Sequence, residues 1–153
     1  MNSIRLTKED NSLYGQRNNT VEDGVGIQQN MHFESGLLWV GAIGDFSLED
    51  AEQAFLEMLE AVAQHKAEQI LFDGRHVKGN PKDIERFYYG EFAARETRRI
   101  VVEHNIVPRF GYVLHEPLRD PARLGETVAV NRGMLIKVFA VPEDAFEWLT
   151  SAR

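Results

Sequence analysis

The stretch from Leu37 to Val62, LLWVGAIGDFSLEDAEQAFLEMLEAV, decides the fold class, because it joins a buried strand to an amphipathic helix. Its first eight residues, LLWVGAIG, are a nearly continuous apolar run with the length of a central β-strand. Ser47 can then cap a helix, and Glu49 and Asp50 in the first turn favour its positive end. The apolar side chains that follow recur at helical spacing, with glutamates pointing outward between them. A strand followed directly by such a helix is the basic unit of α/β proteins.

A second strand precedes this unit. Over residues 27–33 apolar side chains alternate with polar ones, which predicts a strand with one buried face. Ser35-Gly36 is so short a connection that we expect a hairpin. Residues 1–24 are rich in Asn, Asp, Glu and Gly and carry few large apolar side chains. We therefore expect residues 1–24 to form a polar N-terminal tail or loosely docked arm, and residues 25–153 to form a single domain.

Further strands and helices alternate along the rest of the chain. We expect strands at 69–72, 110–114 and 135–139, and helices from Asn80-Pro81 to about Asn105, from Pro121 to about Gly133, and from Pro142 onward. Strand–helix alternation implies right-handed crossovers and mainly parallel neighbours. The sequence thus predicts an α/β fold: a mixed five-stranded sheet, with an N-terminal hairpin and then mainly parallel strands, and about four helices.

The composition excludes several classes of function. The net charge of −7 argues against general binding to nucleic acid or to anionic membranes. The absence of cysteine excludes disulfides, thiolate zinc sites and a cysteine nucleophile. No segment approaches the roughly 20 apolar residues of a membrane span, and the N-terminus lacks the apolar stretch of a signal peptide. No phosphate-binding loop or nucleophile elbow follows a strand. We expect a soluble cytoplasmic protein without membrane insertion, cofactor, metal or catalytic motif.

Three stretches carry a family resemblance: GLLWVGAIGDFSLEDAEQ (36–53), ILFDGR (70–75) and VAVNRGMLIKVFAVPEDAFEWL (128–149). Together with the order of elements, they resemble the STAS (sulfate transporter and anti-sigma-factor antagonist) domains, and in particular their divergent SpoIIAA-like branch. The resemblance covers most of the chain from Gly26 onward. It implies a STAS-like fold and a small regulatory or protein-interaction domain rather than an enzyme.

The resemblance also implies a position for a phosphorylation switch. Regulatory STAS proteins carry a Ser or Thr at the start of the helix after the third strand, where a phosphate would change the docking surface. The corresponding stretch here, DGRHVKGNPKDIERFYYGEFAARE, has no Ser or Thr before Thr97, and Asn80 stands at the acceptor position. We therefore expect no phosphoserine switch there.

One edge of the predicted sheet is a candidate ligand site. Open α/β sheets bind ligands at the carboxyl ends of their strands. This edge should collect the following polar side chains: Asp45, Asp73, Arg75, His76, His115 and Glu116. Such a set could bind a lipid, nucleotide or anion, or support weak acid–base chemistry. Because related folds carry lipids, an apolar ligand cavity is a further alternative. The alternative is that these are ordinary turn residues, because no metal-ligand spacing links the histidines.

The predicted helix over residues 80–105 is unusually aromatic. If Ile84, Phe87, Ala94 and Val101 form its buried stripe, three rings fall mostly off that stripe: Tyr88, Tyr89 and Phe92. They either pack under neighbouring loops or the N-terminal arm, or form an exposed patch for a protein partner or a second copy of the chain.

The same helix carries two further features that bear on an interface. Gly90 would let another backbone or a ligand approach closely. Arg95 and Arg99 belong to a basic stripe that could bind an acidic partner, although Glu91 and Glu96 are spaced to pair with them. A homodimer through this helix is therefore one hypothesis and a small-ligand protein is the alternative.

Overall fold

The computed structural model describes residues 8–9, 11–12 and 26–151. Two short strands, β1 (Lys8–Glu9) and β2 (Asn11–Ser12), pair with each other near the N-terminus. The remaining elements are β3 (Ile27–Glu34), β4 (Leu37–Asp45), α1 (Leu48–His65), β5 (Gln69–Lys78), α2 (Asp83–His104), β6 (Arg109–Val113), α3 (Leu124–Asn131), β7 (Leu135–Phe139) and α4 (Pro142–Thr150). Most of the N-terminal arm expected over residues 1–24 lies outside the described residues.

The main sheet has five strands in the order β3-β4-β5-β6-β7. β3 and β4 are antiparallel and the other neighbours are parallel, which confirms the predicted mixed sheet and its hairpin. The hairpin turn consists of Ser35 and Gly36, whose φ angles of 54° and 81° are both in the left-handed region. Two consecutive positive φ values suit the right-handed twist of a two-residue hairpin.

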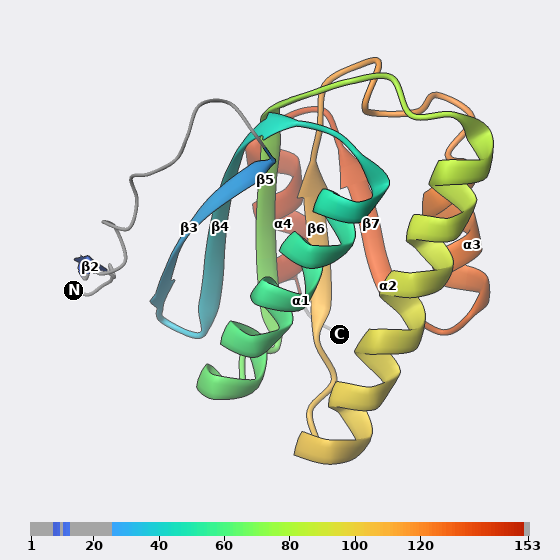
Figure 1. The fold of residues 1–153 in the computed structure, drawn as a ribbon. Coiled ribbons are helices and arrows are strands. Elements are labelled where there is room, and N and C mark those ends of the chain that lie inside the picture. The colour runs from blue at the N-terminus through green and yellow to red at the C-terminus, as the bar shows by residue number, and fades with distance from the viewer. Residues whose placement is uncertain (1–7, 10, 13–25, 152–153) are drawn as a thin grey trace.

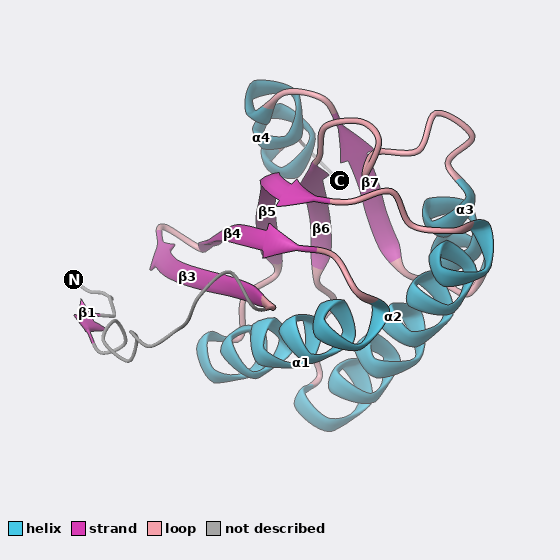
Figure 2. Ribbon diagram, turned by 45° about the horizontal axis from the view of Figure 1, so that its top comes forward, coloured by secondary structure: helices cyan, strands magenta, loops and turns pink. Residues whose placement is uncertain are grey.

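The helices cover the two faces of the sheet unequally. Figures 1 and 2 show α1, α2 and α3 on one face and α4 alone on the other. The three-helix side holds the larger apolar core, with Phe55, Met58 and Phe110 almost fully buried. The α4 side holds a smaller core in which Leu149 packs with Leu71 and other apolar residues. Both faces are covered at the centre of the sheet, which explains the nearly continuous apolar sequence of its inner strands.

The helix starts differ in part from the predictions. The Ser47 hydroxyl accepts a hydrogen bond from the Asp50 amide at 3.1 Å, which confirms the predicted cap of α1. Pro142 is the first residue of α4, also as predicted. The prediction that Asn80-Pro81 opens α2 was wrong, because the helix begins at Asp83, where the Lys82 amide donates to the Glu85 carboxylate at 2.8 Å.

The third helix also begins later than expected. Pro121 does not open α3, which starts at Leu124. The Asp120 carboxylate accepts hydrogen bonds from the amides of Leu124 and Ala122, both at 3.0 Å, and so satisfies donors at this end of the helix. The residues before α3 therefore form a loop that stands over the helical face of the sheet.

Strand β5 is longer than the sequence indicates. It continues through Asp73-Gly74, expected to be turn residues, as far as Lys78. Its pairing with β4 shifts register after Gly41, where Gly41 pairs with Asp73 but Ile43 pairs with His76. The extra residue in β5 is a β-bulge, which allows a strand to continue with altered side-chain directions.

The buried face of α2 also differs from the predicted stripe. Ile84 is 52% exposed, and the buried residues are Gly90, Ala93, Ala94, Thr97 and Ile100. Apart from Ile100 these side chains are small, so the helix lies close to the rest of the three-helix layer and larger rings fill the space beside it.

Candidate ligand cavity

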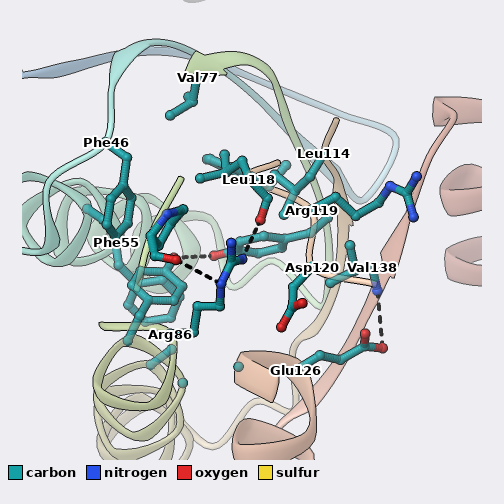
Figure 3. A pocket seen from close by; sticks show the side chains of 18 of the residues that line it. Phe46, Phe55, Val77, Arg86, Leu114, Leu118, Arg119, Asp120, Glu126 and Val138 are labelled. Carbon is teal, nitrogen blue, oxygen red and sulfur yellow. Dashed lines mark hydrogen bonds between the residues drawn. The ribbon is translucent and has the colours of Figure 1, made fainter. Parts of the chain in front are cut away.

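A cavity of about 260 Å³ lies between the three-helix layer and the sheet. Helices α1, α2 and α3 and strands β3, β5, β6 and β7 all contribute to its wall, and the loop from Leu118 to Pro121 lines one end. This places it toward the carboxyl ends of the parallel strands, where open α/β sheets hold ligands. Figure 3 shows its lining side chains at close range.

The lining is mainly apolar. Its larger apolar members are Ile27, Phe46, Phe55, Met58, Phe72, Val77, Leu114, Leu118, Ile136 and Val138. They come from both the sheet and the helices, so a bound molecule would be enclosed on several sides. Ligand sites in proteins usually combine such an apolar lining with a few placed polar groups.

Two glycines set the separation of α2 and α3 along one wall. A Cβ on Gly90 would lie well inside 3.0 Å of the Gly125 carbonyl oxygen, and a Cβ on Gly125 would lie 3.0 Å from the Arg86 carbonyl oxygen. The close approach expected at Gly90 is thus made by the chain's own third helix. Any larger side chain here would push the two helices apart and change the wall of the cavity.

Two tyrosine hydroxyls meet inside the cavity. The hydroxyl of Tyr89 on α2 lies 2.8 Å from that of Tyr112 on β6. Burial raises the pKa of Tyr89 to about 12, and burial together with Tyr89 raises the pKa of Tyr112 well above its usual value. Both phenols are therefore neutral at physiological pH. One donates to the other, so the pair keeps a second O–H for which the described residues supply no acceptor.

A third polar group in the lining is an amide. The Gln29 Nε2 donates to the Ala54 carbonyl oxygen at 3.0 Å, which holds the side chain against α1. Its Oε1 is buried and has no hydrogen-bond partner among the described residues. A buried unpaired acceptor is costly, so this oxygen is suited to a donor supplied from the cavity.

Arg86 on α2 brings a positive charge to the loop end of the cavity. Its guanidinium donates to the carbonyl oxygens of Leu118 at 2.8 Å, Pro117 at 2.9 Å and Pro81 at 3.2 Å. In Figure 3 it lies between Phe46 and Phe55 on one side and Asp120 on the other. No carboxylate among the described residues forms an ion pair with it, although its charge helps to lower the pKa of Asp120.

A second arginine lines the same end. Arg119 pairs with the Glu116 carboxylate at 3.2 Å through its Nη2, while its Nε is buried without a hydrogen-bond partner in the described part of the chain. Asp120 uses its carboxylate for the amides at the start of α3, and these hydrogen bonds are the main reason why its pKa is lowered. The loop end is therefore polar and rich in N–H donors, in contrast to the apolar interior.

The polar residues expected at the sheet edge lie elsewhere. Arg75 donates to both carboxylate oxygens of Asp73, at 2.9 Å and 2.8 Å, and this hydrogen bonding is the main cause of the lowered pKa of Asp73. Asp73 follows Leu71 on the α4 side of the sheet, away from the cavity. His76 lies close enough to act on the Asp73 carboxylate, but no interaction brings His115 to them.

None of the six predicted edge residues lines the cavity, including the exposed Asp45, His115 and Glu116. Among residues 26–151 and the two short N-terminal strands, no group of three or more His, Asp or Glu side chains could hold a metal ion. The local Asp73–Arg75 pair, two residues apart in β5, is sufficient to explain why both residues occur there. The ligand role predicted for this edge remains a prediction.

The aromatic residues of α2 divide between the interior and the surface. Tyr89 and Phe92 pack against the larger core, and both rings lie edge-on to Phe55, with ring centroids 6.0 Å and 6.3 Å away. Tyr88 is 47% exposed and stands against Phe87. Of the three rings considered for an exposed patch, those of Tyr88, Tyr89 and Phe92, only that of Tyr88 is well exposed.

The two arginines of the predicted interface are on the surface. Arg99 forms an ion pair with Glu96 at 2.9 Å, and Arg95 lies over the Phe92 ring, 5.3 Å from its centroid. The sequence left open whether these arginines bind an acidic partner or pair locally, and Arg99 pairs locally within α2. The interface role of these residues stays a prediction.

The sequence reasoning identified Tyr89 but not its partner. Tyr112 belongs to an apolar strand, and nothing in that strand alone indicates that its hydroxyl meets α2. Gln29 shows only the polar alternation of its strand. Arg86 belongs to the basic stripe of the aromatic helix, a pattern that gives no sign of a cavity. Only the packing of three helices on the sheet brings these groups around one cavity.

No protein-family model matches the sequence, and no curated protein matches it. The structure is similar to the crystal structure of an anti-sigma factor antagonist from Mycobacterium paratuberculosis, with a TM-score of 0.54 and 15% identity, over 86% of this chain and 100% of that one. The chain has the STAS/SpoIIAA-like fold. An uncharacterized DUF3478 protein with a SpoIIAA-like fold, from Shewanella loihica PV-4, aligns at a TM-score of 0.46 and 20% identity, over 86% of this chain and 99% of that one.

The structure shows where the residues considered for a phosphorylation switch lie. Asn80 lies in the segment between β5 and α2, and Thr97 lies in the middle of α2 with 5% of its surface exposed. Thr97 is therefore neither at a helix start nor accessible. Within the described residues, no helix has the length and apolar character needed to cross a membrane.

Proposed function

We propose that this protein is a non-enzymatic SpoIIAA-like domain that binds a small amphipathic molecule in the cavity beneath α1, α2 and α3. The observation that carries the proposal is the combination of an apolar cavity of about 260 Å³ with unpaired polar atoms in its wall. An apolar cavity can stay dry, but a buried amide oxygen and a spare phenol O–H are costly without partners. A ligand that offers a donor and an acceptor satisfies both.

The position of the polar groups indicates how such a ligand would lie. The apolar lining suits a hydrocarbon or aromatic body, and the Tyr89–Tyr112 pair supplies one neutral donor inside the cavity. Arg86 and the buried Nε of Arg119 supply N–H groups at the loop end. An acceptor-bearing end, such as a carboxylate, hydroxyl or carbonyl, would therefore lie toward the loop, and the apolar end toward Phe55 and Phe72.

Thermal unfolding with a set of probes tests this proposal. The probes are medium-chain alkanoic acids, the matching alkanols and the matching alkyltrimethylammonium salts. A ligand at about 100 times its Kd stabilises the native state by about 2.7 kcal/mol. For a chain of this length, that raises Tm by about 5 to 10 °C. We expect the acids or alkanols to raise Tm and the cationic salts not to do so.

A matched pair of variants locates the binding. Ala93 lines the cavity, so Ala93→Leu should fill part of it and abolish the shift. Ala63 on α1 is partly buried but does not line the cavity, so Ala63→Leu should keep the shift. A wild-type protein that no probe stabilises, or an Ala93→Leu protein that responds like the wild type, would contradict the proposal.

A second candidate is the regulatory or protein-interaction role implied by the family resemblance. The observation in its favour is exposed apolar surface on the α4 side of the sheet, where Trp39, Ile43 and Phe146 are 39%, 58% and 44% exposed. The rings of Trp39 and Phe146 stack, with centroids 6.0 Å apart. Exposed apolar surface of this kind often binds proteins. Co-purification with wild-type and Trp39→Glu proteins tests it: a partner lost only from the variant supports it, and identical partner sets contradict it.

A further inference from the structure

Strand β3 forms one edge of the main sheet and pairs there only with β4 among the described strands. It is eight residues long, and its register with β4 is continuous from Ile27 to Glu34. Natural proteins protect such edges with proline, lysine, bulges or short strands. The sequence of β3, IQQNMHFE, has none of these protections. Among the described residues no strand pairs with its outer side, so an edge of this length is a template for another strand.

The hairpin determines which backbone groups face outward. Glu34 and Leu37 flank a two-residue turn and form a closing pair, and in an antiparallel ladder hydrogen-bonded pairs alternate along the strands. The Asp45 amide donates to the Gly26 carbonyl oxygen at 3.4 Å, which fits the same alternation at the other end. The even-numbered residues of β3 therefore bond to β4. The odd-numbered residues, 27, 29, 31 and 33, point their N–H and C=O groups outward.

The apolar side of β3 is also incompletely covered. Met31 and Phe33 face α1 and pack against the larger core, yet they are only half-buried. Leu38 and Val40 on the neighbouring strand face the same way and are each 1% exposed. The difference arises because β3 has a neighbour on one side only. A strand added at this edge would cover the row of half-buried side chains as well as the backbone groups.

We propose that a second copy of this chain pairs with β3 in an antiparallel arrangement and joins the two sheets into one of ten strands, five from each copy. A two-fold axis requires the interface to be self-complementary. Residues whose backbone N–H and C=O groups point outward must lie opposite each other, because these groups form the new hydrogen bonds. The register that pairs residues 27, 29, 31 and 33 in this way places Ile27 opposite Phe33 and Gln29 opposite Met31 of the second copy. Its axis passes beside Asn30. This proposal is independent of ligand binding.

The charges of the strand agree with this register. Its ionisable side chains are His32 and Glu34, which are bonded to each other at 2.8 Å. With the axis at Asn30, His32 lies opposite Gln28 of the second copy, and Glu34 lies opposite its Gly26. Like charges directly opposite each other would destabilise the strand pair, and this register has none.

The position of Asn30 on the axis provides a sharp test. Asn30 is exposed on the side of the sheet away from α1, so charged substitutions there leave the core intact. Asn30→Lys places two lysines opposite each other in the dimer, and Asn30→Asp places two aspartates. We expect the wild-type full chain to be a dimer in sedimentation velocity at low salt from micromolar to submillimolar concentration. Each variant alone should be a monomer and an equal mixture of the two should form a heterodimer.

Gln53, exposed on α1, supplies the matched control, because Gln53→Lys and Gln53→Asp make the same charge changes away from the edge. Both should remain dimers. A wild-type monomer throughout the concentration range would overturn the proposal. So would dimers of both single Asn30 variants, or an Asn30 mixture that stays monomeric.

Discussion

Replacing Gly90 with alanine tests the close packing of α2 against α3. Alanine is favoured over glycine inside a helix by about 1 kcal/mol, so an isolated helix would gain stability. Here the added Cβ would lie well inside 3.0 Å of the Gly125 carbonyl oxygen and 3.3 Å from the Val128 Cβ. Because ordinary contact begins near 3.4 Å, the helices must separate by more than 0.4 Å (3.4 minus 3.0).

The obstacle at Gly90 is backbone and cannot rotate away, unlike a flexible side chain. Overpacking costs about 1 to 3 kcal/mol. A clash with backbone that cannot move aside takes the upper end of this range, about 3 kcal/mol. We expect Gly90→Ala to lower the free energy of unfolding by about 2 kcal/mol after that gain is included. For a chain of this length, the corresponding fall in Tm is about 4 to 8 °C.

Urea unfolding followed by circular dichroism measures the change, and Gly41→Ala is the matched control. Gly41 lies inside β4, and a Cβ there would meet only the Asn30 Oδ1 at 3.7 Å, an ordinary contact. The same substitution should therefore be neutral or stabilising at Gly41. If Gly90→Ala were as stable as the wild type, the argument that the two glycines set the helix separation would be wrong.

Two further predictions concern the tyrosine pair. Tyr89 has a pKa of about 12 in the folded protein against an ordinary value of 10.0, so the folded state holds its proton longer. This difference in pKa stabilises the folded state fully below pH 10, and the stabilisation is lost at about 1.4 kcal/mol per pH unit as pH rises toward 12. Urea midpoints at several pH values measure the loss. A pH dependence of stability that Tyr89→Phe leaves unchanged would refute the prediction. Tyr112→Phe removes the 2.8 Å hydrogen bond and leaves the Tyr89 hydroxyl unpaired, so the free energy of unfolding at neutral pH should fall by about 1 to 2 kcal/mol; no fall would mean that the bond is energetically neutral.

The hydrophobic pattern was sufficient to predict the sheet and its hairpin. Residues 37–44 are apolar on both sides of β4, although the α4 side leaves Trp39 and Ile43 exposed. The polar alternation of residues 27–33 reflects an edge strand with one covered face. Helix starts were predicted correctly where a side chain or a proline acts locally, as at Ser47 and Pro142.

The other two helix starts depend on tertiary contacts. Pro81 is buried in the wall of the cavity, and its carbonyl oxygen accepts a hydrogen bond from Arg86, so the chain stays extended for two more residues before α2 begins. A proline has the same φ in an extended segment as in a first helical turn. The sequence pattern could not distinguish the two.

The candidate site was less accessible to sequence reasoning than the fold. Because ligands bind at the carboxyl ends of parallel strands, we predicted a site at the end of the sheet toward which the cavity lies. The residues that we selected there were charged, and Asp73 and Arg75 pair with each other instead. The cavity depends on small residues on α2 and on aromatic rings of α2. The hydrophobic pattern of the sequence did not show on which face of the helix these rings lie. Neither feature has a spacing that a sequence reveals.

The order of the strands in space is the same as their order in the chain. No strand has to be inserted between two that are already in place, so during synthesis the sheet can grow by addition at one side as each strand–helix unit leaves the ribosome. Contacts between consecutive units also keep the loops that must close short, which favours rapid folding. The β3–β4 hairpin is made first, and each later strand adds on the β4 side. Strand β3 therefore lies at the edge of the sheet from the earliest stage. It is available to a partner chain before the last helix has been made.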